Sequence, residues 1–220
     1  ANTGMVAGQS LSSNPGLISR TTNGGNTWSY IQYNTVGAVI RDIYFINSLT
    51  GYMAGSSNAK LMKTTDAGLT WADQSTIPGF PAETNYGSVY ALDTGNIFIT
   101  STNMKALYNY KTGIGWSSIS LPGNFTIYSD ILFKDANTGY ISGNGNYFAY
   151  TTNGGTSWTQ SNTSSNVGMH DMEYVNGVLY MAGDYQNIFK STNNGVTWSS
   201  VYFYDNANAY QPPVNSPGII

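Results

Sequence analysis

The chain has 220 residues, enough for one sizeable core in a single domain. Only 9% of the residues are charged and the formal net charge is −3, while the eight lysine and arginine residues are scattered singly, which argues against nucleic-acid binding. The absence of cysteine excludes disulfides, thiolate metal sites and a cysteine nucleophile, and no apolar run approaches the length of a membrane span.

One short phrase recurs along the chain, first at 21–28 as Thr-Thr-Asn-Gly-Gly-Asn-Thr-Trp. It returns at 64–71, 151–158 and 191–198, and a degenerate copy without the Asn or Asp lies at 110–116. The copies follow one another at intervals of 40 to 45 residues, a period typical of propellers and solenoids. Each copy ends on one of the five tryptophans: Trp28, Trp71, Trp116, Trp158 and Trp198.

The phrase has the chemistry of a tight turn between two strands. Its Asn or Asp side chain can accept hydrogen bonds from main-chain N–H groups, and the glycine two residues later adopts positive φ without steric cost. The tryptophan brings a large apolar area, which we expect to pack between neighbouring sheets. These structural roles are assigned to Asn23, Asp66, Asn153 and Asn193 and to Gly25, Gly68, Gly155 and Gly195.

A second pattern, Thr-Gly-Tyr-x-x-Gly, lies between the turns. It is clear at 48–55 and 136–143, it matches 1–8, and it is looser at 176–183. Short alternating apolar runs stand before the later copies, as at 43–46. Each full repeat therefore holds four strand candidates separated by turn residues.

In the second repeat the four strands are predicted at 41–46, 51–55, 60–65 and 70–74. No segment keeps a 3.6-residue apolar period over three turns, so nothing helical competes. Four antiparallel strands in a period of this length form the blade of a β-propeller. The predicted fold class is therefore all-β, a β-propeller of four-stranded antiparallel blades with five repeats in the chain.

We expect one propeller domain over 1–205 and a Pro-containing tail over 206–220. The first repeat begins at its second strand, so its innermost strand is missing. The ring could close through the irregular tail, the chain could be a piece of a larger propeller, or a neighbouring molecule could complete the open blade. The expected blades span about 1–39, 40–85, 86–126, 127–168 and 169–205.

The turn phrase resembles the Asp-box, or bacterial neuraminidase repeat, Ser/Thr-x-Asp-x-Gly-x-Thr-Trp. Together with the Gly-Tyr-x-x-Gly strand, it makes the chain similar to the photosystem II assembly-factor and sortilin-type repeat group over nearly its whole length through Trp198. This resemblance implies a propeller whose turns lie on the outer part of each blade. The arginine-rich channel surface of the photosystem group has no counterpart here, which argues against photosystem assembly.

Asp-boxes also occur in sialidases, which resemble one another in an arginine triad, a Tyr–Glu pair and an acid Asp. This chain has two arginines, Arg20 and Arg41, so a triad is impossible. Its glutamates are Glu83 and Glu173, and no spacing indicates the pair of carboxylates that a glycosidase places across a cleft. We therefore expect no catalytic residues and a protein that is not an enzyme.

An acid recurs at the start of the innermost strand, as Asp42, Asp130 and Asp171, with Ser88 in the third repeat. In a propeller these residues would surround one mouth of the central channel. One interpretation is a ligand site of oxygen donors, joined by the rare side chains Arg41 and His170, which each precede such an Asp. The other is that each Asp caps its own loop by accepting main-chain N–H groups. We expect no metal and no cofactor.

The leading functional hypothesis is a non-enzymatic extracellular or cell-surface propeller that binds protein or serves as a structural module, for example as one subunit of a surface assembly or filament. Its partner would be another protein, or a second copy joined through the open first blade and the C-terminal tail. The location rests on the charge-poor Asn/Tyr/Thr/Gly composition, which resembles that of secreted bacterial repeat proteins. The alternative is a glycan-binding or glycan-hydrolysing propeller that uses exposed tyrosines as a platform.

Overall fold

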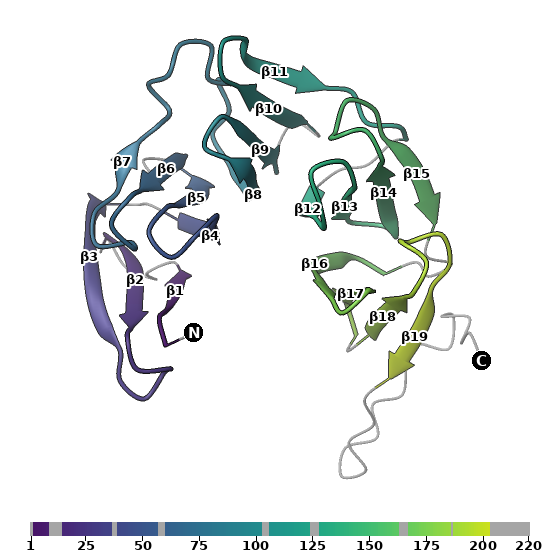
Figure 1. Cartoon of the computed structure of the whole chain (residues 1–220), viewed down its shortest axis with the longest axis horizontal. Helices are drawn as coiled ribbons and strands as arrows, with labels where there is room; N and C mark the ends of the chain where they lie inside the picture. The colour runs from purple at the N-terminus through teal and green to yellow at the C-terminus, as the bar shows by residue number, and fades with distance from the viewer. Residues whose placement is uncertain are drawn as a thin grey trace. The chain divides into compact units, whose positions relative to one another are not determined.

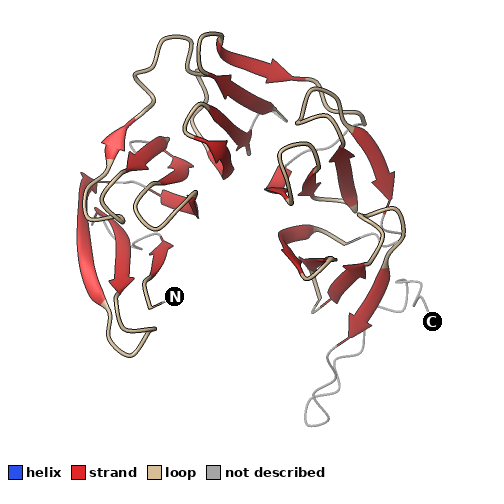
Figure 2. Ribbon diagram, viewed as in Figure 1, coloured by secondary structure: helices blue, strands red, loops and turns tan. Residues whose placement is uncertain are grey.

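The computed structural model describes residues 2–8, 15–36, 39–56, 60–102, 106–123, 128–162, 167–185 and 187–202. This part of the chain is all-β, with nineteen strands and no helix (Figures 1 and 2). It accordingly contains no helix that could cross a membrane. The strands form five antiparallel sheets, which we number in chain order, and these are the blades of a β-propeller, as the sequence predicted.

The chain divides into two compact units, Ala1–Ser118 and Ile119–Ile220, which are described separately. The first unit holds three sheets. The first sheet is β1 (Gly4–Gly8), β2 (Pro15–Thr21) and β3 (Ser29–Val36). The second is β4 (Val39–Phe45), β5 (Gly51–Ser56), β6 (Leu61–Thr64) and β7 (Ala72–Asp73). The third is β8 (Tyr86–Asp93), β9 (Asn96–Ser101), β10 (Leu107–Lys111) and β11 (Gly115–Ile119).

The second unit holds two sheets. The fourth sheet is β12 (Tyr128–Phe133), β13 (Gly139–Gly143), β14 (Tyr147–Thr151) and β15 (Thr159–Asn162). The fifth is β16 (Met169–Val175), β17 (Val178–Gly183), β18 (Asn187–Ser191) and β19 (Ser199–Tyr202). The predicted tail at 206–220 lies outside the described residues, so how the ring closes stays a prediction.

In each sheet, strands that are consecutive in the chain lie next to each other. In the second sheet the observed strands lie close to the four predicted segments, because alternating residues and turn residues there mark both ends of each strand. The first sheet has three strands in the described part of the chain. There β1 holds the place that β5, β9, β13 and β17 hold as second strands in the other sheets.

Each intact copy of the turn phrase is held by the same hydrogen bonds. In the first copy the Thr21 hydroxyl donates to Asn23 Oδ1 at 2.9 Å and accepts the N–H of Gly25 at 3.0 Å. Asn23 Oδ1 also accepts the N–H of Thr27 at 2.9 Å, and Trp28 Nε1 donates to the Gly25 carbonyl at 3.1 Å. Gly25 has φ 92°, which a side chain would strain.

The degenerate copy in the third sheet, at 110–116, lacks this arrangement. Trp116 Nε1 is buried and has no hydrogen-bond partner among the described residues. Its ring instead packs edge-on against Phe80, with ring centroids 5.2 Å apart, and against Tyr110 at 5.4 Å. Phe80 comes from the long connection between β7 and β8, so an insertion in one repeat supports the altered turn of the next.

Apolar residues between neighbouring sheets form the core. Ile18 of the first sheet packs with Ile40, Met53 and Met62 of the second. A second cluster joins the second and third sheets, and a third joins the fourth and fifth. Burying one such side chain is worth about 1.5–3 kcal/mol, so these junctions supply much of the stability of each unit.

Trp28 is more exposed than the other tryptophans of the intact turn copies, and its packing between sheets stays a prediction. Its side chain is 46% exposed, whereas Trp158 is 8% exposed. Trp71 packs into the cluster between the first and second sheets, and Trp198 lies edge-on to Phe148 of the fourth sheet. Within the described residues of the first unit, no sheet lies beside Trp28 in the place where the first sheet lies beside Trp71.

Candidate functional site

The recurring acid of the second repeat joins two sheets. Asp42 lies on β4 at an irregularity in the pairing between β4 and β5. Its Oδ2 accepts the hydroxyl of Ser88 at 2.6 Å and the N–H of Val89 at 2.8 Å, both on β8. The carboxylate therefore connects the innermost strand of the second sheet with that of the third.

Asp130 repeats this arrangement in the second unit. It lies at the corresponding irregularity between β12 and β13, and its Oδ2 accepts the N–H of Met172 on β16 at 2.9 Å. Its Oδ1 accepts the N–H of the adjacent Ile131 at 2.8 Å. Main-chain N–H groups are among the donors, as the second interpretation of these acids held, but those of Val89 and Met172 come from the following sheet and not from the acid's own loop.

Asp171 holds the same place on β16, again beside a pairing irregularity. It is exposed, and it makes no hydrogen bond within the described residues. The fifth sheet is the last described sheet of its unit, so the N–H that Asp42 and Asp130 each find on the next sheet is not supplied there.

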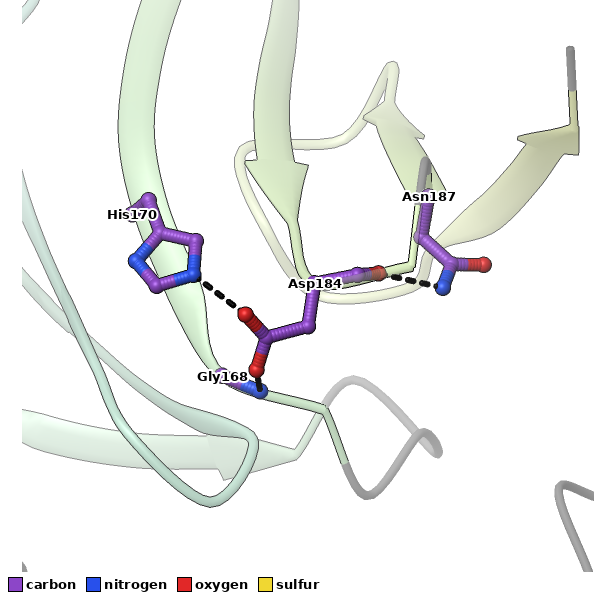
Figure 3. A network of polar contacts seen from close by, with 4 residues as sticks. All are labelled: Gly168, His170, Asp184 and Asn187. Carbon is purple, nitrogen blue, oxygen red and sulfur yellow. Dashed lines mark hydrogen bonds and ion pairs between the residues drawn. The ribbon is translucent and has the colours of Figure 1, made fainter. Parts of the chain in front are cut away.

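His170 forms a separate polar network with a residue that the sequence did not single out (Figure 3). Its Nε2 lies 2.6 Å from Asp184 Oδ1, and Asp184 Oδ2 accepts the N–H of Gly168 at 2.9 Å. The Asp184 carbonyl accepts Asn187 Nδ2 at 2.7 Å. The network ties the start of β16 to the turn between β17 and β18, and both members of the His–Asp pair are exposed to solvent.

The environment of Asp184 favours its charged form. The hydrogen bond from His170 is the largest cause of a lowered Asp184 pKa, partial burial opposes it, and the Gly168 N–H adds to the lowering. One signal in the sequence pointed to this residue. The glycine that ends the second strand is followed by Ser56 in the second repeat, by Asn144 in the fourth, and by an acid in the fifth.

Arg41 lies exposed on β4, beside Asp42 in the first unit, while Asp130, His170 and Asp171 lie in the second unit. A single channel-mouth site that unites all five therefore stays a prediction. Within the described residues, no group of three or more His, Asp or Glu side chains is placed to hold a metal ion.

The two glutamates have different environments. Glu83 is buried in the connection between β7 and β8, and its Oε1 accepts the hydroxyl of Tyr108 at 2.7 Å. Burial, and then this hydrogen bond, raise the pKa of Tyr108 to about 12. Glu173 is exposed on β16. Glu83 is thus hydrogen-bonded to Tyr108 within the first unit, and Glu173 belongs to the second unit.

Comparison with known proteins bears on this fold. Residues 108–209 match the family model PSII_BNR, described as photosynthesis system II assembly factor YCF48. The chain resembles the BNR-type propellers of this group. A comparison with curated protein sequences found no match.

Solved structures of BNR-type propellers share the fold. YCF48 bound to a D1 peptide is 16% identical with a TM-score of 0.59, and the match covers 91% of this chain and 72% of that one. YCF48 from Cyanidioschyzon merolae is 17% identical with a TM-score of 0.64, covering 91% and 67%. The GH74 xyloglucanase from Xanthomonas campestris is 14% identical with a TM-score of 0.65, covering 91% and 36%. At these identities the likeness is one of fold.

Proposed function

We propose that this chain is a non-enzymatic, protein-binding propeller that acts in assembly, as a binding or structural module. The observation that carries the proposal is the use of the recurring acids. Asp42 and Asp130 accept hydrogen bonds from the strand of the following sheet, so both are occupied in joining blades. The fold likeness to a YCF48 structure that holds a D1 peptide supports a protein partner.

The proposal includes a secreted or cell-surface location for the protein. A charge-poor composition with 25 glycines and 18 tyrosines suits a secreted or cell-surface repeat protein. The partner would be another protein or a second copy of the chain. An extracellular location is tested by fractionating the native cells and probing intact cells with an antibody against the chain.

A glycan-directed function is the alternative, and one local feature favours it. Tyr185, exposed on the turn after β17, directly follows Asp184 of the His170–Asp184 pair. An exposed aromatic ring beside a polar pair is a suitable platform for a sugar face. The GH74 neighbour shares the fold.

One experiment separates the two functions. The purified 220-residue chain is tested for hydrolysis of xyloglucan and sialyl substrates, and for saturable binding to a glycan array and to an array of extended peptides. We expect peptide binding and no hydrolysis. Hydrolysis that Asp184→Asn abolishes, while a matched surface variant such as Asp135→Asn retains it, would overturn the non-enzymatic proposal.

A further inference from the structure

Five asparagines of the chain are followed directly by glycine. They are Asn23, Asn144, Asn153, Asn176 and Asn194. An asparagine in this position can lose its side-chain amide to water, because the glycine has no Cβ to hinder ring closure at its main-chain nitrogen. The pairs are alike in sequence, but they differ in what holds the two groups that must react, the asparagine amide and the glycine N–H.

The reaction needs water and no other reagent. The main-chain nitrogen of the glycine loses its proton and attacks Cγ of the asparagine, a new C–N bond closes a cyclic imide, and the Cγ–Nδ2 bond breaks as ammonia leaves. Water then opens the imide at either carbonyl, which gives aspartate or isoaspartate. Ring closure therefore requires an amide that can turn toward the glycine nitrogen and a glycine N–H that solvent can reach.

Hydrogen bonds hold both reacting groups in the turn phrase. Asn153 Nδ2 donates to Ser157 Oγ at 2.8 Å, and Asn153 Oδ1 accepts the N–H of Ser157 at 2.9 Å. The N–H of Gly154 donates to the Asn137 carbonyl at 2.9 Å. The first copy, around Asn23, has the corresponding bonds. In both copies the amide cannot turn toward the glycine nitrogen until these bonds break.

Asn194, in the last copy of the phrase, is held by residues of the preceding repeat. Its Oδ1 accepts Lys134 Nζ at 2.9 Å and the Tyr140 hydroxyl at 3.1 Å. The N–H of Gly195 donates to Ser191 Oγ at 2.9 Å. The amide and the glycine N–H are therefore both hydrogen-bonded here as well, although by different partners.

Asn176 and Gly177 form the tight turn between β16 and β17, where Val175 pairs with Val178. Both turn residues are exposed, and their φ angles are 50° and 85°. Within the described residues, neither the Asn176 side chain nor the N–H of Gly177 makes a hydrogen bond. Water reaches both groups, and no such bond has to break before the amide turns toward the glycine nitrogen.

Asn144 is an intermediate case. It lies half-buried in the turn between β13 and β14, and neither its side chain nor the N–H of Gly145 makes a hydrogen bond to the described part of the chain. Its Oδ1 lies 3.3 Å from the point where a Cβ on Gly168 would stand, so neighbouring main chain restricts the side chain. We therefore expect Asn144 to react after Asn176.

We propose that Asn176 is a modification site, deamidated by water in the folded protein, whereas hydrogen bonds preserve the asparagines of the turn phrase. The product carries one more negative charge on the turn between β16 and β17. Where the product is isoaspartate, the main chain gains one carbon atom inside this turn, which disturbs the pairing of Val175 with Val178. The change accumulates as the molecule ages, and it does not depend on the proposed function.

Peptide mapping over time tests the proposal. The purified 220-residue chain is incubated at mildly alkaline pH, and mass spectrometry with fragmentation locates each deamidated residue. Asn176 should react about tenfold faster than the asparagines of the turn phrase, which must first break several hydrogen bonds. The rate at Asn144 should lie between these values. Deamidation of Asn153 as fast as that of Asn176 would overturn the proposal.

The same chain unfolded in urea is the control for effects of sequence. Unfolding removes the hydrogen bonds but leaves each asparagine with the same neighbours along the chain, so the rates at the five asparagines should become similar. If Asn176 kept its full advantage in urea, the difference would come from the sequence and not from the structure, and the proposal would fail.

Two variants test the reacting amide and its protection separately. Asn176→Gly removes the amide but keeps a residue that accepts positive φ, so the chain should fold and the peptide with this turn should show no mass gain. Ser157→Ala removes the acceptor of Asn153 Nδ2, so Asn153 should deamidate about fivefold faster. An unchanged rate at Asn153 in Ser157→Ala would contradict the protection given to the turn phrase.

Discussion

Asp130 on β12 accepts the main-chain N–H of Met172 on β16 across the boundary between two sheets, at 2.9 Å. Asp42 and Val89 repeat this bond in the first unit at 2.8 Å. Removing the acceptor leaves a partly buried donor unsatisfied. Asp130→Ala should therefore lower the free energy of unfolding by about 1–3 kcal/mol, measured by urea denaturation.

Asp171→Ala is the matched control for this change, because Asp171 holds the same repeat position without a partner in the described residues. Asp171→Ala should alter the free energy of unfolding by no more than about 0.5 kcal/mol. Equal losses for Asp130→Ala and Asp171→Ala would contradict the role given to the bond between sheets.

The glycine of the turn phrase is predicted to matter for two separable reasons. Gly195 has φ 81° and lies against the ring of Phe148, so Gly195→Ala adds both backbone strain and a steric conflict. Gly113 has φ 83°, but a Cβ there would meet nothing. Gly113→Ala should lower the free energy of unfolding by about 1–2 kcal/mol from strain alone, and Gly195→Ala should cost more. Thermal denaturation of both variants provides the comparison.

Asp66 makes one turn sensitive to acid. Hydrogen bonds from the Thr70 hydroxyl, the Thr70 N–H and the Thr64 hydroxyl lower the Asp66 pKa from 3.8 to about 2. A group whose pKa is lowered in the folded state stabilises the fold above its unfolded pKa, and this contribution is lost as the pH falls through the folded value. The stabilisation is thus complete above pH 3.8 and disappears toward pH 2.

Asp66→Asn tests this titration without removing the turn, since the other intact copies carry Asn at this position. We expect the variant to lose less thermal stability than the unmodified chain between pH 4 and pH 2. Parallel curves for the two proteins over this range would show that the turn does not favour the charged form of Asp66.

The His170–Asp184 pair yields a prediction about ionisation. His170→Ala removes the largest cause of the lowered Asp184 pKa, so that pKa should rise toward its ordinary value. Carbon-detected NMR titration of the Asp184 carboxyl measures the change. Because the pair is exposed, the melting temperature should shift little. An Asp184 pKa that stays low in the variant would assign the effect to the Gly168 N–H.

Trp116 and Trp158 should respond differently to the same change. Trp158 Nε1 donates to the Gly155 carbonyl at 3.2 Å, while the buried Nε1 of Trp116 has no acceptor in the part of the chain that the structure describes. Replacement by Phe removes a hydrogen bond in one case and an unsatisfied donor in the other. Trp158→Phe should cost about 1–2 kcal/mol more than Trp116→Phe in urea denaturation.

The sheets could be predicted because their signals are local. An Asx residue and a glycine at fixed spacing form the turn, and an alternating run forms the strand beside it. Residues close together in the sequence were therefore sufficient to predict each strand and turn. The partner of Asp130 depends on how two sheets pack, and Met172 lies 42 residues away. The sequence marked the acid as recurrent but could not show that its donor belongs to the next repeat.

The pairing of His170 with Asp184 was missed for a related reason. The two residues lie 14 positions apart on either side of a hairpin, and a register irregularity in β16 separates Met169 from Asp171. A simple alternation pattern cannot predict how such a bulge turns a side chain. Glu83 was missed as a buried residue because its connection has no counterpart in the other repeats.

The bonds that Asp42 and Asp130 accept from Val89 and Met172 both run toward the repeat that follows. An extra copy of the repeating unit, inserted by duplication of its gene segment, would therefore bring an acid for its successor and an N–H for its predecessor. No compensating substitution is needed elsewhere. A protein joined in this way can change its number of blades by whole-unit gain or loss, and evolution can alter its size without redesigning its joints.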